Sequence, residues 1–64
     1  MTPKFGDMVE NGWASENNPR RVGIFVRKKV SQNMPCWELT DGKGDLWLTF
    51  SDKNAKLKII HKEV

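Results

Sequence analysis

The amino-acid sequence predicts a small all-β protein, a single domain over residues 1–64 whose strands curl into a closed or half-open barrel. Helical periodicity is poor, because no window of about a dozen residues keeps an apolar stripe free of glycine and proline. Apolar and polar residues alternate more clearly, and turn residues recur at short intervals. A five-stranded sheet leaves exposed edges unless it closes, which favours a barrel. The competing class, an open α+β sheet, lacks a segment for its helix.

The first two strands are expected in residues 5–10 and 20–30, joined by the loop "NGWASENNPRR". In the first strand Val9 is expected to face the core, with Phe5 as a second candidate. In the second strand, alternation places Val22, Ile24 and Val26 on the core face and Arg21, Phe25 and Arg27 on the outer face. Gly23 within this strand indicates a bend or bulge of the kind that turns a barrel corner.

The segment "CWELTDGKGDLWLTF", residues 36–50, predicts the clearest hairpin of the chain. Its turn contains Gly42 and Gly44, which tolerate positive φ. On its second strand Leu46, Leu48 and Phe50 are expected to face the core, while Trp47 and Thr49 face outward. Residues 51–56 are expected to form one short helical turn capped by Ser51 or Asp52. The last strand is expected in residues 57–64, with Leu57 and Ile59 facing in.

This order of elements resembles the small SH3-like β-barrels over nearly the whole chain. In that pattern a "GDxV" strand comes first, here Gly6, Asp7 and Val9, and a long loop, a three-stranded meander, a short helical turn and a final strand follow. The segments "NGWASENNPRRVGIFVR" and "LTDGKGDLW" are also similar to small uncharacterised proteins of bacteriophages and prophages. That resemblance implies an accessory protein without catalytic activity and supplies no known site. The aromatic cage of methyl-lysine readers is not expected, because the chain has no tyrosine and no suitably placed set of three aromatic residues.

Size and composition limit how the domain is stabilised and where it works. A chain of 64 residues buries only about 60% of its unfolded surface. With Cys36 as the one cysteine and His61 as the one histidine, neither an internal disulfide nor a structural zinc site is expected. The sequence "MTPKFGDMVE" has no apolar signal region and no run is long enough to span a membrane, so a cytoplasmic location is predicted, in the host cell if the protein is phage-encoded.

The outer face expected for the second strand is the main candidate binding site. Basic residues surround an aromatic ring there, and the hairpin is expected to add Trp47 to the same face; the basic residues are Arg20, Arg21, Arg27, Lys28 and Lys29, and the ring is Phe25. Such a face is suited to single-stranded nucleic acid, since cations neutralise phosphates and rings stack on bases. It is equally suited to a protein, because Trp and Arg dominate interface hot spots. In a third interpretation Phe25 and Trp47 turn inward and the arginines form a solvated rim.

Trp13 lies among turn residues and has two interpretations. It is either a lid folded over the end of the barrel, which a core this small needs, or an exposed contact on the long loop. A second basic group lies towards the C-terminal end of the sequence: Lys53, Lys56, Lys58, His61 and Lys62. These residues are expected either to prevent an edge strand from pairing with another chain or to extend the basic surface.

Nothing in the sequence indicates catalysis or a cofactor. Cys36 lies beside Pro35 and Trp37 and is expected to be a small buried thiol. A catalytic Cys36–His61 pair is the alternative, but no third, orienting group or oxyanion site is evident for it. Asp41 and Asp45 flank a turn that they are expected to stabilise, and "GKGD" lacks the spacing of a phosphate-binding loop.

The sequence therefore predicts a binding module that is not an enzyme. In the leading hypothesis it binds and modulates a host or phage protein, as a monomer or weak homodimer. In the alternative it binds single-stranded DNA or RNA. The net charge of only +3, with eight acidic residues dispersed among eleven basic ones, favours the protein partner.

Overall fold

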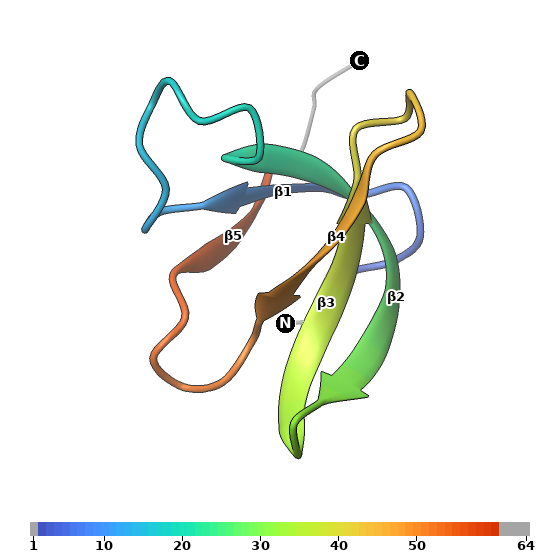
Figure 1. The fold of residues 1–64 in the computed structure, drawn as a ribbon, viewed down its shortest axis with the longest axis vertical. Helices are drawn as coiled ribbons and strands as arrows, with labels where there is room; N and C mark the ends of the chain where they lie inside the picture. Colours follow the sequence, from blue (N-terminus) through green and yellow to red (C-terminus); the bar gives the residue numbers. More distant parts are fainter. Residues whose placement is uncertain (1, 61–64) are drawn as a thin grey trace.

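The computed structural model describes residues 2–60, and within them five antiparallel strands form one sheet without any helix. The strands are β1 (Met8–Asn11), β2 (Val22–Ser31), β3 (Met34–Thr40), β4 (Leu46–Phe50) and β5 (Leu57–Ile60). Their order in the sheet is β4-β3-β2-β1-β5 (Figure 1). The prediction of an all-β fold with five strands is confirmed.

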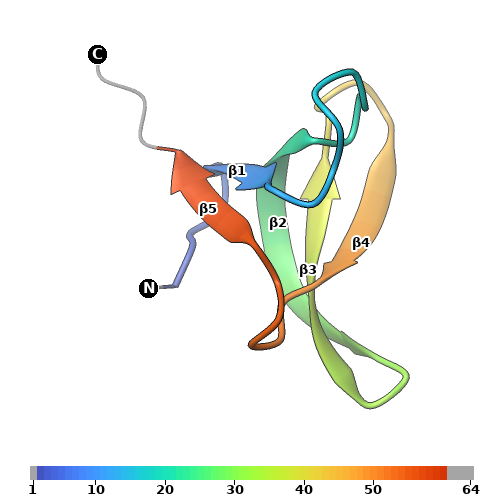
Figure 2. The same cartoon turned by 90° about the vertical axis from the view of Figure 1, so that its left-hand side faces the viewer.

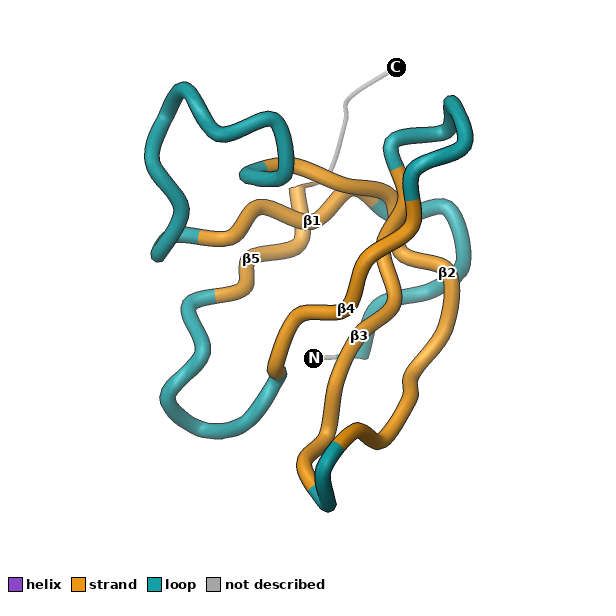
Figure 3. Tube along the Cα trace, viewed as in Figure 1, coloured by secondary structure: helices purple, strands orange, loops and turns teal. Residues whose placement is uncertain are grey.

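The sheet curls but does not close. Figure 2 shows β5 and β4 at opposite ends of the sheet, and within the described residues neither is hydrogen-bonded to the other. Two long connections bridge the space between them, the β1–β2 loop and the β4–β5 loop (Figure 3). In the β4–β5 loop, residues 52–55 form a single turn in which the Ala55 N–H donates to the Asp52 carbonyl at 3.0 Å, in place of the expected helical turn. The expected last strand is seen from Leu57 to Ile60, and its remaining residues lie outside the described part.

Two hairpin turns have residues at positive φ. The β2–β3 hairpin closes through Gln32 and Asn33, with φ of 53° and 63°, between the paired residues Ser31 and Met34. Two successive positive φ angles give a turn whose twist matches that of the flanking strands. In the β3–β4 hairpin the positive φ falls on Gly42 and Gly44, as predicted.

The predicted faces of β2 are wrong from the start of the strand. Gly23, which is paired with the buried Val9, faces the core, so Val22 and Ile24 face outward.

Further along β2, a bulge separates Phe25 from Arg27. Phe25 pairs with Leu39 and Arg27 pairs with the adjacent residue Glu38, so Val26 is the extra residue. Simple alternation puts Phe25 and Arg27 on the same face, whereas the bulge puts them on opposite faces. Phe25 is only 4% exposed and forms the core with Val9 and Leu39. Its ring meets that of Trp37 edge-to-face at 5.6 Å.

The faces predicted for β4 are reversed in the structure. Trp47 and Thr49 pair with Leu39 and Trp37 on the core face, and Trp47 packs against the core. Leu46, Leu48 and Phe50 lie on the outer face, where they are 57%, 45% and 48% exposed. Both sets of side chains are apolar, so the alternation of "LWLTF" did not decide between them, and the larger indole occupies the core.

The N-terminal residues also differ from the prediction. β1 begins at Met8, and Phe5 lies before it and is exposed. Val9 is fully buried, as expected. Leu57 packs partly buried against the same core, and Ile59, its neighbour on the same face of β5, is half-buried.

Candidate functional site

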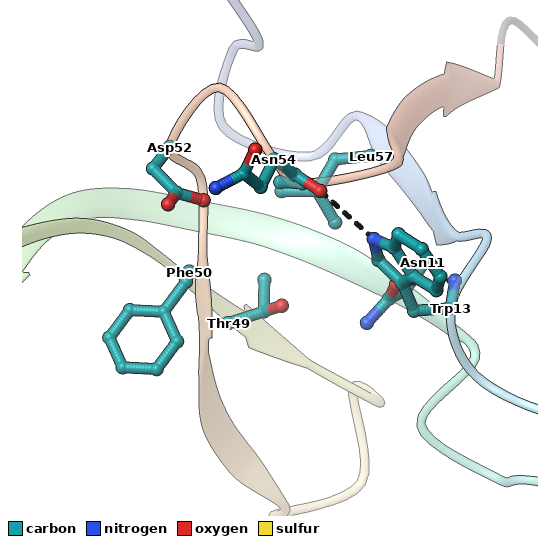
Figure 4. A pocket seen from close by; sticks show the side chains of 8 residues that line it. Asn11, Trp13, Thr49, Phe50, Asp52, Asn54 and Leu57 are labelled. Atoms are coloured by element: carbon teal, nitrogen blue, oxygen red, sulfur yellow. Dashed lines mark hydrogen bonds between the residues drawn. The ribbon is translucent and has the colours of Figure 1, made fainter.

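Trp13 is exposed and at the same time held in position at the open side of the sheet. Its side chain is 67% exposed, yet its indole N–H donates to the Asn54 carbonyl at 3.0 Å (Figure 4). Its backbone N–H donates to the side chain of Asn11 at 2.9 Å, and Lys56 Nζ lies 4.3 Å from the centre of the ring. The ring therefore joins the β1–β2 loop to the β4–β5 loop without being covered by either.

A shallow hollow of about 200 Å³ opens beside this ring, between the two loops and the end of β4 (Figure 4). Trp13, Ala55 and Leu57 supply its apolar surface, and Phe50 borders it with its ring turned away (Figure 4). Its polar lining comes from Asn11, Thr49, Asp52 and Asn54. A partly apolar concavity with a few convergent polar groups is the general form of a binding site.

Sequence reasoning missed most of this hollow. It named Trp13 but neither Leu57 nor Asn54 as binding residues. Asn54 is 41 positions away from Trp13 in the chain, and only the folded arrangement of the two loops brings them together.

Arg20 and Trp47 form a second local arrangement. The guanidinium of Arg20 lies 5.3 Å from the centre of the Trp47 ring. It also donates two hydrogen bonds to the Asp45 carboxylate, at 3.1 and 3.0 Å. Because the cation covers the indole and faces a carboxylate, Trp47 is partly buried and is not the free stacking surface expected from the sequence.

The side chain of Arg21, next to the start of β2, forms hydrogen bonds with β1 and with the β1–β2 loop. Its Nε donates to Glu10 Oε2 at 3.2 Å, and its Nη1 donates to the Ala14 carbonyl. The side chain is half-buried, so its main contacts are within the domain.

The basic residues beyond the bulge largely face a single carboxylate. Glu38, whose side chain is 13% exposed, lies 2.9 Å from Arg27 Nε and 3.4 Å from Lys29 Nζ. Lys28 is exposed and has no carboxylate within salt-bridge distance among residues 2–60.

The predicted basic-aromatic face is therefore not one surface. Phe25 is in the core, and Trp47 lies beneath Arg20. Of the outer cations, Arg27 and Lys29 share the carboxylate of Glu38. The structure does bring Arg20 together with Trp47, and Arg27 together with Lys29. It places Trp13 elsewhere, at the open side of the sheet.

Cys36 and Asp41, which were weighed as candidate reactive groups, form hydrogen bonds within the domain. Cys36 is buried, and its thiol donates to the Met34 carbonyl at 3.5 Å, while His61 lies outside the described residues. Hydrogen bonds donated by the backbone N–H groups of Lys43 and Asp45 lower the pKa of Asp41 from its ordinary value of 3.8. This carboxylate stabilises the turn, as predicted. No group of three metal-ligating side chains is found among residues 2–60.

Comparison with known protein families, with characterised proteins and with solved structures gave no match to this chain. In the described part of the chain no helix has the length and apolar character needed to cross a membrane.

Proposed function

We propose that this chain is a non-enzymatic binding module that engages another protein at the open side of the sheet, with Trp13 as the principal contact. The observation that carries the proposal is that Trp13 is exposed although its indole N–H and its ring are both engaged. Tryptophan is among the residues that contribute most to protein interfaces. A ring that is already immobilised loses little conformational freedom on binding, which favours affinity.

The lining of the hollow next to Trp13 supports a protein as the partner. Its apolar lining, with Ala55 and Leu57 beside Trp13, suits one apolar side chain of a partner. The neighbouring Asn54 and Asp52 offer hydrogen-bond acceptors at the rim. This combination of an apolar centre and a polar rim is typical of protein interfaces.

The element order supports assigning the fold to the SH3-like barrels as part of the same proposal. The chain has a "GDxV" sequence leading into β1, a long β1–β2 loop, a β2–β3–β4 meander and a last strand paired with β1. The similarity of the Trp13 loop and the Gly42–Gly44 hairpin to phage and prophage proteins supports a host or phage protein as the target, in the host cytoplasm.

Single-stranded nucleic acid is the less supported partner. Stacking requires an accessible ring beside unpaired cations. On the face predicted from the sequence Phe25 is buried, and four of the cations face a carboxylate: Arg20, Arg21, Arg27 and Lys29. The exposed ring of Trp13 lies away from that face, with Lys56 beside it. Binding of phosphates would have to compete with those ion pairs.

Affinity capture from a nuclease-treated bacterial lysate tests the proposal. We expect the wild-type chain to retain a protein that Trp13→Ala does not retain. Val30→Ser is the matched control, because Val30 is also exposed and apolar but lies on the distal part of β2. Loss of the retained protein on nuclease treatment would indicate a nucleic-acid partner, and equal retention by wild type and Trp13→Ala would contradict the role of Trp13.

A further inference from the structure

Strand β4 forms an uncharged, apolar edge of the sheet. It pairs with β3 on one side and, among the described residues, with no strand on the other (Figure 2). The segment Leu46–Phe50 contains no charged residue, and its outer face presents Leu46, Leu48 and Phe50 about half exposed. The opposite edge strand, β5, differs because it carries the exposed Lys58. Lysine on an edge strand opposes pairing with another chain, and β4 contains no lysine.

The unpaired backbone groups of β4 belong to the same residues as the exposed side chains. At the two ends of the β3–β4 ladder, the Ser51 N–H donates to the Pro35 carbonyl at 3.0 Å and the Asp41 N–H donates to the Asp45 carbonyl at 3.3 Å. Hydrogen-bonded and non-hydrogen-bonded pairs alternate along an antiparallel ladder. The N–H and C=O groups of Trp47 and Thr49 therefore point to β3, and those of Leu46, Leu48 and Phe50 point to the free edge.

We propose that β4 is a homodimerisation edge, which pairs antiparallel with β4 of a second copy about a two-fold axis at Leu48. In this register Leu48 faces the same residue of the other copy, and Leu46 faces Phe50. Each residue that supplies a free N–H and C=O then also supplies an apolar side chain to the contact. A two-fold contact requires such a self-complementary strand, because the same surface is used on both sides.

The absence of charge from β4 argues for a second copy as the occupant. Antiparallel self-pairing of Leu46–Phe50 buries no charged group and places no like charges opposite each other, which would destabilise a strand pair. The copies carry a net charge of +3 each, so their mutual repulsion is small and added salt weakens it further. Dimerisation through β4 therefore becomes stronger, not weaker, as salt is added.

The buried area predicts a weak dimer. Since a large apolar side chain offers roughly 200 Å², half-exposed Leu46, Leu48 and Phe50 on two copies contribute roughly 600 Å² of apolar area. This is below the 1,200–2,000 Å² that is usual in stable complexes, even with the strand backbone added. We expect dissociation in the micromolar to millimolar range, with fast exchange.

Sedimentation equilibrium of the isolated chain, from about 10 µM to about 1 mM, tests this proposal. The weight-average mass of the wild type should rise with concentration and reach at least about 1.5 times the monomer mass at the highest concentration. Leu48→Lys should stay monomeric, because two ammonium groups would meet at the two-fold axis. Leu48 lies opposite Glu38 in the sheet, so the fold tolerates this substitution. Val30→Lys adds the same charge on β2, away from the free edge of β4, and should dimerise as the wild type does.

Amide hydrogen exchange by NMR locates the contact independently of any variant. The amides of Leu46, Leu48 and Phe50 should become at least about tenfold more protected between dilute and concentrated samples, and the exposed Lys58 amide on β5 should not. A wild type that stays monomeric at about 1 mM overturns the proposal. So does a dimer that Leu48→Lys leaves intact, or one whose concentration-dependent protection appears on β5. The capture experiment with Trp13→Ala is unaffected by any of these outcomes, so the two proposals stand or fall separately.

Discussion

The indole of Trp47 lies directly against the α-carbon of Gly23. A Cβ at position 23 would lie 2.6 Å from Cζ2 of Trp47 and 3.0 Å from the Cβ of Leu39. Gly23 is thus glycine because the ring of a strand two positions away in the sheet occupies the space of its side chain. This contact fixes which face of β4 is turned inward.

Gly23→Ala should destabilise the domain by about 1–3 kcal/mol, since overpacking forces the backbone or the indole to move. Urea denaturation followed by tryptophan fluorescence measures the change. In a Trp47→Leu background the same substitution should cost less, because the closest contact has been removed. An equal cost in both backgrounds would show that the indole is not the obstacle.

Arg20→Gln should lower the free energy of unfolding by about 0.5–1 kcal/mol, because an exposed ion pair and an exposed cation–π contact are each worth little. It should also change the fluorescence of Trp47, whose ring the guanidinium covers. Thermal unfolding followed by tryptophan fluorescence, at low and at high salt, measures the change in stability and the change in emission. If the variant is as stable as the wild type and its emission is unchanged, Arg20 is not held over Trp47 in solution.

Asp41→Asn should be less stable than the wild type at neutral pH, and this difference should shrink in acid. The pKa of Asp41 is lowered in the folded protein, so its charged form is stabilised by folding. That stabilisation is present above the unfolded pKa, near 3.8, and is lost as the pH falls through the lower folded pKa. Melting temperatures at about pH 7 and about pH 2.5 give the comparison. A difference that is the same at both pH values would contradict the role of the charge.

Glu38→Gln should free Arg27 and Lys29 and lower the free energy of unfolding by about 1 kcal/mol. If local pairing is what restrains binding to phosphates, this variant should bind a labelled single-stranded oligonucleotide more tightly than the wild type at about 50 mM salt. Fluorescence anisotropy measures both affinities. A wild type that already binds tightly, with no gain in the variant, would favour the nucleic-acid hypothesis.

The number and order of the strands could be predicted from the sequence because turn residues mark their ends. Gly42 and Gly44 identify the central hairpin, and Val9 is correctly placed in the core. The faces of β2 could not be predicted, since a glycine, Gly23, takes the core position opposite Val9 while the apolar Val22 and Ile24 flank it. The bulge at Val26 then interrupts the alternation before Arg27. The faces of β4 depend on Gly23, a neighbour supplied by another strand.

The candidate site was predictable only at Trp13. Its unusual position among turn residues drew attention to it, and the structure places it in contact with a loop that lies far along the chain. The paired state of the arginines could not be foreseen, because Glu38 and Asp45 come from other strands or turns. Both interpretations of Trp13 contain part of the answer: the ring joins two loops, and it is still exposed.

The most direct test of the binding proposal is the affinity of a captured target for the wild type and for Trp13→Ala, measured by isothermal titration calorimetry. Trp13 is largely exposed, so its removal should leave the melting temperature within a few degrees of the wild type. We expect the dissociation constant to rise at least about 30-fold, as for a hot-spot residue worth about 2 kcal/mol. A folded Trp13→Ala variant that binds within about twofold of the wild type would contradict the account.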